Sequence, residues 1–145
     1  MLRKILVPWD GSPHSRNALK FLVSLLAVQQ PAEVHLLNVQ HVPPMLEQMA
    51  DGRPSHVHEY EAPEAATGST ILKAGVDAAR AAGLKCVARV VFGDPAQSIA
   101  NYAKTYHCDE IVMGARGLGN VETLVLGSVA HKVLHLVHVP VTIVK

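Results

Sequence analysis

The sequence contains few cysteines, no excess charge of either sign and no long apolar run. Cys86 and Cys108 are its only cysteines, and because neither lies in a Cys-x-x-Cys pair, they predict packing thiols rather than a disulfide framework. Lysine and arginine number 13 against 12 acidic residues, so no basic surplus exists to neutralise a nucleic acid or an anionic membrane. The longest nearly apolar run, Phe21 to Val28, contains Ser24 and is too short to cross a bilayer. We expect neither nucleic acid nor membrane as a partner.

The first residues also lack the core of a signal peptide, because Pro8 and Asp10 interrupt the apolar stretch too early. The sequence therefore predicts a cytoplasmic protein. A chain of 145 residues with 49% apolar content can build one hydrophobic core but not two. Since no internal repeat or boundary is visible, we expect a single domain over residues 1–145.

Apolar runs of two kinds alternate along the chain. Short, β-branched runs predict five strands, at Lys4–Val7, Glu33–Val39, Leu84–Val91, Glu110–Met113 and Val139–Val144. Several of them are apolar at successive residues, which is typical of parallel strands buried on both faces. Residues between the strands predict four helices, at 12–29 (opened by Ser12 and Pro13), 63–82 (ended by Gly83), 94–106 (opened by Asp94 and Pro95) and 127–137.

This order predicts an α/β fold with an open, doubly wound, five-stranded parallel sheet, which is Rossmann-like. In such sheets ligands bind at the carboxyl ends of the strands, where the winding reverses. Here that place is formed by the turns after the first and fourth strands. An irregular segment at about 40–62, rich in Pro, His, Glu and Met, is either a flap over the site or disordered.

A glycine-rich loop follows the fourth predicted strand, as Gly114-Ala115-Arg116-Gly117-Leu118-Gly119-Asn120, and Gly127-Ser128 opens the last helix. Glycines let consecutive N–H groups converge on an anion, and a helix start adds free N–H groups and a positive dipole end. Together they favour a phosphate site with Ser128 Oγ as a further donor. Two plainer alternatives are a simple chain reversal and a helix N-cap at Gly127-Ser128. The loop is not a Walker A sequence, so these residues alone do not name ATP.

At this point the sequence resembles the universal stress protein family. Gly114, Gly117 and Gly127-Ser128 match the Gly-x2-Gly-x9-Gly-Ser/Thr pattern of its ATP-binding members. The Ile5–Ser12 stretch resembles the first strand and the Val-Asp-Gly-Ser turn of the family. The Gly93-Asp94-Pro95 turn and the closing Val139–Val144 stretch are also similar. The resemblance covers the whole chain and implies the adenine nucleotide alpha hydrolase-like form of the Rossmann-like fold.

The resemblance implies a site for ATP, or another adenine nucleotide, together with Mg²⁺. Asp10 would face the ribose or the phosphate-bound Mg²⁺, and Pro8 and Trp9 would line the adenine pocket. Val39 would meet the adenine edge through its backbone, and Met113 would form part of the wall. The other residues implied to surround the ribose and phosphates are Gly114, Ala115, Arg116, Gly117, Leu118, Gly119, Asn120, Gly127, Ser128, Val129 and Ala130. The family also implies a homodimer that pairs the last strand, about Val139–Val144, across a two-fold axis.

Several of these residues have plainer interpretations. Asp10 also suits the turn before an N-capped helix, and Trp9, where smaller residues are usual, could stack on adenine, narrow the pocket or belong to the core. His56 and His58 lie two residues apart, but a flexible loop presets no third ligand. His131 and His135 share a helix face without an acidic residue between them, so we expect surface or interface histidines.

These features predict an ATP-binding regulatory protein whose nucleotide stabilises or switches a dimer. The alternative is a slow Mg²⁺-dependent ATPase, for which no residue that would orient the attacking water stands out. A phospho-acceptor receiver domain fits less well because Asp10 has no acidic neighbour.

Overall fold

The computed structural model describes residues 2–27, 31–42, 63–117 and 126–145, with the side chains of 63–66 left aside. The described strands are β1 (Arg3–Pro8), β2 (Ala32–Gln40), β3 (Lys85–Phe92), β4 (Glu110–Gly114) and β5 (Val141–Val144). The described helices are α1 (Pro13–Leu26), α3 (Pro63–Ala81), α4 (Pro95–Thr105) and α5 (Ser128–Leu136). The strands form one parallel sheet in the order β3-β2-β1-β4-β5, which confirms the predicted α/β class and topology.

The winding of the sheet reverses at β1. From β1 the chain proceeds outward through β2 to β3, and it then returns to the other side of β1 to form β4 and β5. In register, Val7 lies opposite Leu36 of β2, and Leu6 lies opposite Ile111 of β4. The reversal therefore lies between the neighbouring strands β1 and β4, at the place that the sequence predicts for a ligand crevice.

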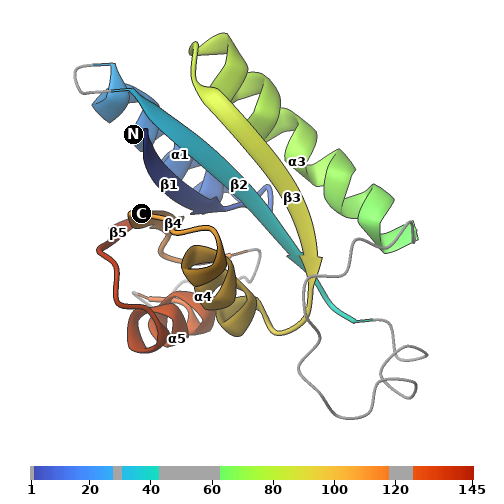
Figure 1. Ribbon diagram of the computed structural model, residues 1–145. Coiled ribbons are helices and arrows are strands. Elements are labelled where there is room, and N and C mark those ends of the chain that lie inside the picture. The colour runs from blue at the N-terminus through green and yellow to red at the C-terminus, as the bar shows by residue number, and fades with distance from the viewer. Residues whose placement is uncertain (1, 28–30, 43–62, 118–125) are drawn as a thin grey trace.

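Helices α1 and α3 cover one face of the sheet, and α4 and α5 cover the other (Figure 1). Ile5 and Val7 of β1 point into the core beneath α1 and α3, whereas Leu6 between them points into the core beneath α4. In β4, Val112 likewise points into the core beneath α1 and α3, and Ile111 points into the core on the opposite face. Because both faces are buried, the central strands need apolar side chains at successive positions.

All three helix starts for which the sequence predicts a cap have their N-cap at a predicted residue, and two of these residues cap with their side chains. Ser12 Oγ accepts a hydrogen bond from the N–H of Ser15 at 3.2 Å, and Asp94 caps α4 in the same way. At α5 the N-cap is Gly127, so Ser128 is the first helical residue and its hydroxyl makes no cap. The N-cap predicted at Gly127-Ser128 is therefore made by Gly127.

The last strand is shorter than predicted, because its pairing begins at Val141, opposite Ile111, rather than at Val139. Pro140 has no N–H to donate to the ladder, although its carbonyl oxygen still accepts a hydrogen bond from the N–H of Ile111 at 2.9 Å.

Two glycines inside α3 allow this helix to approach the sheet closely. Glycine in a helix costs roughly 1 kcal/mol relative to alanine. A Cβ at Gly68 would lie 2.7 Å from the Val90 side chain, and a Cβ at Gly75 would lie 3.0 Å from both Leu36 and the Trp9 ring. Close packing against β2 and β3 therefore explains both residues. Gly83, at φ +75°, follows the end of α3 as predicted.

Parts of the sequence-based prediction fall outside the described residues. Gln40 is the last residue of β2, and most of the irregular segment predicted at about 40–62, including His56 and His58, is not described. Residues 118–120 of the glycine-rich loop are not described either.

Candidate functional site

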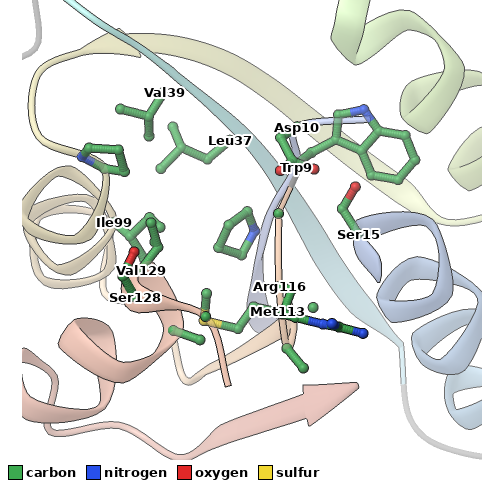
Figure 2. Close-up of a pocket in the computed structure, with 17 residues that line it drawn as sticks. Trp9, Asp10, Ser15, Leu37, Val39, Ile99, Met113, Arg116, Ser128 and Val129 are labelled. Carbon is green, nitrogen blue, oxygen red and sulfur yellow. The ribbon is translucent and has the colours of Figure 1, made fainter. Parts of the chain in front are cut away.

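A cavity of about 440 Å³ opens at the carboxyl ends of the central strands (Figure 2). Its volume falls within the range of about 300–1,000 Å³ that is usual for small-molecule sites. The wall is formed by the ends of β1, β2 and β4, the loop after β4, and the first turns of α1, α4 and α5. The lining residues are Pro8, Trp9, Asp10, Ser15, Leu37, Val39, Pro95, Ile99, Met113, Gly114, Ala115, Arg116, Gly117, Gly127, Ser128, Val129 and Ala130.

Every predicted site residue that the structure describes lines this cavity. From the strand ends these are Pro8, Trp9, Asp10, Val39, Met113 and Gly114. From the loop and α5 they are Ala115, Arg116, Gly117, Gly127, Ser128, Val129 and Ala130. Leu118, Gly119 and Asn120 lie outside the described residues. Residues that are more than a hundred positions apart in the sequence thus surround one space.

Four lining residues were missed by sequence reasoning, namely Ser15, Leu37, Pro95 and Ile99. The sequence did contain a signal for Leu37, because alternate residues of a strand face the same way and Leu37 lies two residues before the predicted Val39. Pro95 and Ile99 lie four residues apart on one face of α4, so a helix starting beside the crevice would have indicated both. Figure 2 shows Leu37, Val39, Ile99 and Val129 on one side of the view, with Asp10, Ser15 and Arg116 on the other.

Asp10 combines a structural role with a position in the cavity wall. Its Oδ1 accepts a hydrogen bond from the N–H of Ser12 at 2.9 Å, so the turn before α1 depends on it. Its Oδ2 faces Gly117, where an added Cβ would lie only 2.7 Å away. The absence of a side chain at Gly117 therefore leaves this carboxylate oxygen facing the glycine loop.

The start of α5 presents backbone donors beside the same loop. The N–H of Gly127 donates to the carbonyl oxygen of Ala115 at 2.6 Å, which ties the helix start to the end of β4. No side chain in the described parts of the chain caps α5, and Ser128 is exposed. The first-turn N–H groups are consequently available to an anion, as the sequence predicts.

The side chain of Arg116 lies toward α1. Its Nη2 atom is 3.5 Å from Nε2 of His14, and Nδ1 of His14 is buried without a partner in the part of the chain that the structure describes. A Cβ at Gly114 would lie 2.6 Å from Cβ of His14. The first turn of α1 thus packs directly on β4 and supports this side of the cavity.

The indole of Trp9 belongs to the core. Trp9 is only 4% exposed, and its Nε1 donates to the carbonyl oxygen of Ile71 in α3 at 2.8 Å. The ring contacts the position of Gly75, on the side of α3 rather than in the cavity. Of the three interpretations of this residue, the structure supports a core tryptophan next to the site.

Neither cysteine contributes a reactive group to the cavity. Burial raises the pKa of the Cys108 thiol to about 11, and it also raises the pKa of Cys86. Both thiols are therefore protonated near neutral pH, in agreement with their interpretation as packing residues.

Among the described residues, no three His, Cys, Asp or Glu side chains converge to hold a metal. No described helix is long and apolar enough to span a membrane.

Comparison with known proteins places the fold and sequence in one family. The model of the universal stress protein family matches residues 1–145. Universal stress protein YxiE of Bacillus subtilis (strain 168) is 34% identical over 149 residues, with all of both chains covered. Universal stress protein MJ0531 of Methanocaldococcus jannaschii is 34% identical over 145 residues, covering all of this chain and 83% of the relative.

Solved structures agree with this placement. Hypothetical protein MJ0577 has a TM-score of 0.77 at 27% identity, over 100% of this chain and 96% of that one. A universal stress protein in complex with cAMP has a TM-score of 0.71 at 24% identity, over 99% and 97% of the two chains. A family protein from Arabidopsis thaliana with AMP bound has a TM-score of 0.70 at 21% identity, over 99% and 91%. The chain belongs to the universal stress protein family.

Proposed function

We propose that this protein binds an adenine nucleotide, specifically ATP, in the cavity at the carboxyl ends of β1 and β4, and that it acts as a nucleotide-dependent regulator. One observation carries the proposal: Asp10, the side-chain-free Gly117 and the uncapped start of α5 line a single cavity. The cAMP and AMP found in two structures of the same fold support an adenine nucleotide as the ligand class.

The chemistry of the wall suits the parts of such a ligand. Leu37, Val39 and Ile99 offer an apolar surface for the purine ring. Backbone N–H groups of the glycine loop and of the α5 start would donate to the phosphates. The Oδ2 atom of Asp10 would help to hold a Mg²⁺ ion, since Mg²⁺ usually binds one or two carboxylates together with substrate phosphates.

The same wall gives less support to hydrolysis. Asp10 is the only acidic side chain among the described lining residues, and one of its oxygens is engaged by Ser12. Hydrolysis also needs a group that orients the attacking water. We therefore propose that bound ATP acts through stability and assembly rather than turnover, because a ligand of the folded state stabilises it by ~2.7 kcal/mol at a hundredfold excess over Kd.

We further propose that the protein is a homodimer formed through β5. This strand is at one edge of the sheet, its residues Val141–Val144 are half-buried, and β4 is its only neighbour among the described strands. An exposed strand edge can pair with the same strand of a second copy across a two-fold axis.

The test begins with native mass spectrometry of the purified protein, followed by titration calorimetry with Mg·ATP. Gly117→Val should abolish binding, because the first carbon of the new side chain would occupy space 2.7 Å from Asp10 Oδ2. Lys132→Ala is the control, since Lys132 is exposed on α5 and does not line the cavity. A nucleotide-free wild-type protein that releases no heat with Mg·ATP would reject the proposal.

A further inference from the structure

Two exposed histidines of α5, His131 and His135, form a pair that the cavity does not use. Their ring centroids are 4.8 Å apart, with an angle of 63° between the ring planes. We propose that these two imidazoles chelate one divalent transition-metal ion of the class Zn²⁺, Ni²⁺ or Cu²⁺. This site is independent of the proposed nucleotide site.

The helix geometry places both rings where one ion can reach them. Residues four apart lie on the same face of a helix, with their Cβ atoms about 5–6 Å apart. Two histidines at this spacing are the arrangement by which a helix supplies two ligands to zinc in metalloproteases. Because His131 and His135 already have their rings in contact, only side-chain rotation is needed to direct one nitrogen of each toward a shared ion.

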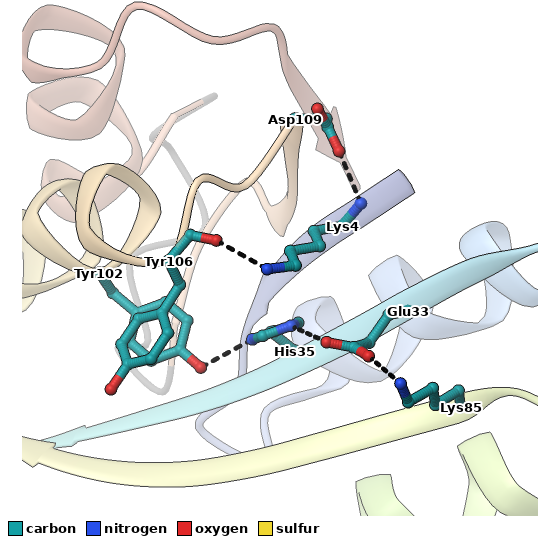
Figure 3. Close-up of polar contacts among 7 residues, drawn as sticks. All are labelled: Lys4, Glu33, His35, Lys85, Tyr102, Tyr106 and Asp109. Carbon is teal, nitrogen blue, oxygen red and sulfur yellow. Dashed lines mark hydrogen bonds and ion pairs between the residues drawn. The ribbon is translucent and has the colours of Figure 1, made fainter. Parts of the chain in front are cut away.

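The two rings are also available for coordination. No hydrogen bond or ion pair joins either of them to another residue in the described parts of the chain. His35 provides the contrast, since its Nδ1 lies 2.8 Å from the Tyr102 hydroxyl and its Nε2 lies 2.7 Å from Glu33 Oε1 (Figure 3). A buried and fully bonded histidine cannot bind a metal without losing these partners, whereas His131 and His135 would displace only water.

The ligand type selects the metal. Imidazole nitrogen suits Zn²⁺, Cu²⁺ and Ni²⁺, whereas Mg²⁺ and Ca²⁺ require oxygen ligands. Among the described residues no further His, Cys, Asp or Glu completes a cluster of three at this place. Water would therefore fill the remaining coordination positions, which leaves the metal open on the solvent side.

Coordination would also act on the helix itself. α5 has 9 residues, and helices this short depend on contacts outside their own backbone. A metal bound by both His131 and His135 would link two successive turns of α5, the second of which is the last turn of the helix. Because the ion binds the paired arrangement in the folded chain, it should raise the temperature of unfolding.

The experiment uses the full chain without an affinity tag, stripped of metal by a chelator, and titrated with Zn²⁺ in a calorimeter at neutral pH. We expect one Zn²⁺ per chain at this site. His131→Ala and His135→Ala should each lower the affinity by about 10²-fold, since the second imidazole binds intramolecularly. His138→Ala and the double variant His56→Ala/His58→Ala are controls that should keep the affinity of the wild type.

Circular dichroism of each variant would verify the fold, which substitution of the exposed His131, His135 or His138 should preserve. Lowering the pH should release the metal, because protonated imidazole cannot coordinate it. Wild-type affinity in both His131→Ala and His135→Ala would overturn the proposal. Loss of Zn²⁺ binding only in the His56→Ala/His58→Ala variant would overturn it as well.

Discussion

Gly114 and Gly117 lie three residues apart at the end of β4, but the absence of a side chain makes room for a different neighbour at each position. A Cβ at Gly114 would meet Cβ and the backbone carbon of His14, at 2.6 and 2.7 Å, whereas among the described residues a Cβ at Gly117 would meet the carboxylate of Asp10. The backbone of His14 cannot move away as easily as the end of the Asp10 side chain can. The same substitution should therefore affect stability at one position and ligand binding at the other.

We expect Gly114→Ala to lower the free energy of unfolding by about 1–3 kcal/mol, the usual cost of overpacking. Gly117→Ala should leave the free energy of unfolding within about 1 kcal/mol of the wild type, since a small shift at the end of the Asp10 side chain can accommodate the methyl group, but should weaken nucleotide binding. Denaturant unfolding and calorimetry on both variants measure the two effects. Equal stability of the two variants would contradict this explanation of the glycines.

Glu33 belongs to a chain of polar contacts on the α4 side of the sheet (Figure 3). Its Oε2 lies 2.6 Å from Lys85 Nζ, and its Oε1 lies 2.7 Å from Nε2 of the buried His35. The hydrogen bond from Lys85, and then that from His35, holds the pKa of Glu33 below its usual value of 4.5. The ion pair between Glu33 and Lys85 exists only while the carboxylate is charged.

A carboxyl pKa that is lower in the folded state contributes stability at pH values above 4.5, and this contribution is lost as the pH falls below 4.5 toward the folded-state pKa. We therefore expect Glu33→Gln to be less stable than the wild type at neutral pH. The difference between the two should shrink progressively in acid. Urea unfolding at a series of pH values measures it, with Asp77→Asn, an exposed residue of α3, as the control. A difference that does not change with pH would contradict the assigned role of Glu33.

At the scale of the elements, local signals predicted the helix starts well. Ser12 and Asp94 act as N-caps because short polar side chains can satisfy free backbone N–H groups within one turn. The faces of the helices were harder to predict, because they depend on the sheet beneath them. Pro95 and Ile99 reach the cavity only because α4 starts beside the end of β2, which no local pattern encodes. The close approach of Gly68 and Gly75 to the sheet likewise depends on the strands beneath α3.

The packing of α3 gives a prediction that reverses the usual helix propensity. Gly75→Ala should destabilise the protein, although alanine favours a helix by roughly 1 kcal/mol over glycine. The new Cβ would press on Leu36 and the Trp9 ring at 3.0 Å. Ala74→Gly, at the adjacent exposed position, should cost only the helix propensity. Thermal unfolding of both variants tests this, and a stabilised Gly75→Ala protein would show that the close approach of α3 is not required.

At the scale of the whole molecule, the topology followed from the order of the elements. Alternating strands and helices with right-handed crossovers leave few arrangements, and successive apolar residues indicated a sheet covered on both faces. The place of the cavity followed from the reversal of winding beside β1. The nucleotide and the dimer came from resemblance to a family, because no spacing of residues in one chain specifies a second copy.

The proposed dimer depends on the apolar edge formed by β5. We expect the double variant Val141→Lys/Ile143→Lys to be monomeric, because two charges per chain would be brought together across the two-fold axis. Light scattering coupled to size-exclusion chromatography gives the mass in solution. Ala88→Lys, at an exposed position of β3 on the opposite edge, should stay dimeric. An unchanged mass for the β5 variant would place the interface elsewhere.

Trp9 is the only tryptophan in the chain, and its indole is held between β1 and α3 directly beside Asp10. The molecule therefore carries a single tryptophan fluorophore, at the boundary between its core and its cavity. Its emission would report water entering the contact between Gly75 and the sheet, without any attached dye. A change in that emission during a nucleotide titration would show that occupation of the cavity alters the packing of Trp9 against α3, a helix none of whose described side chains lines the cavity.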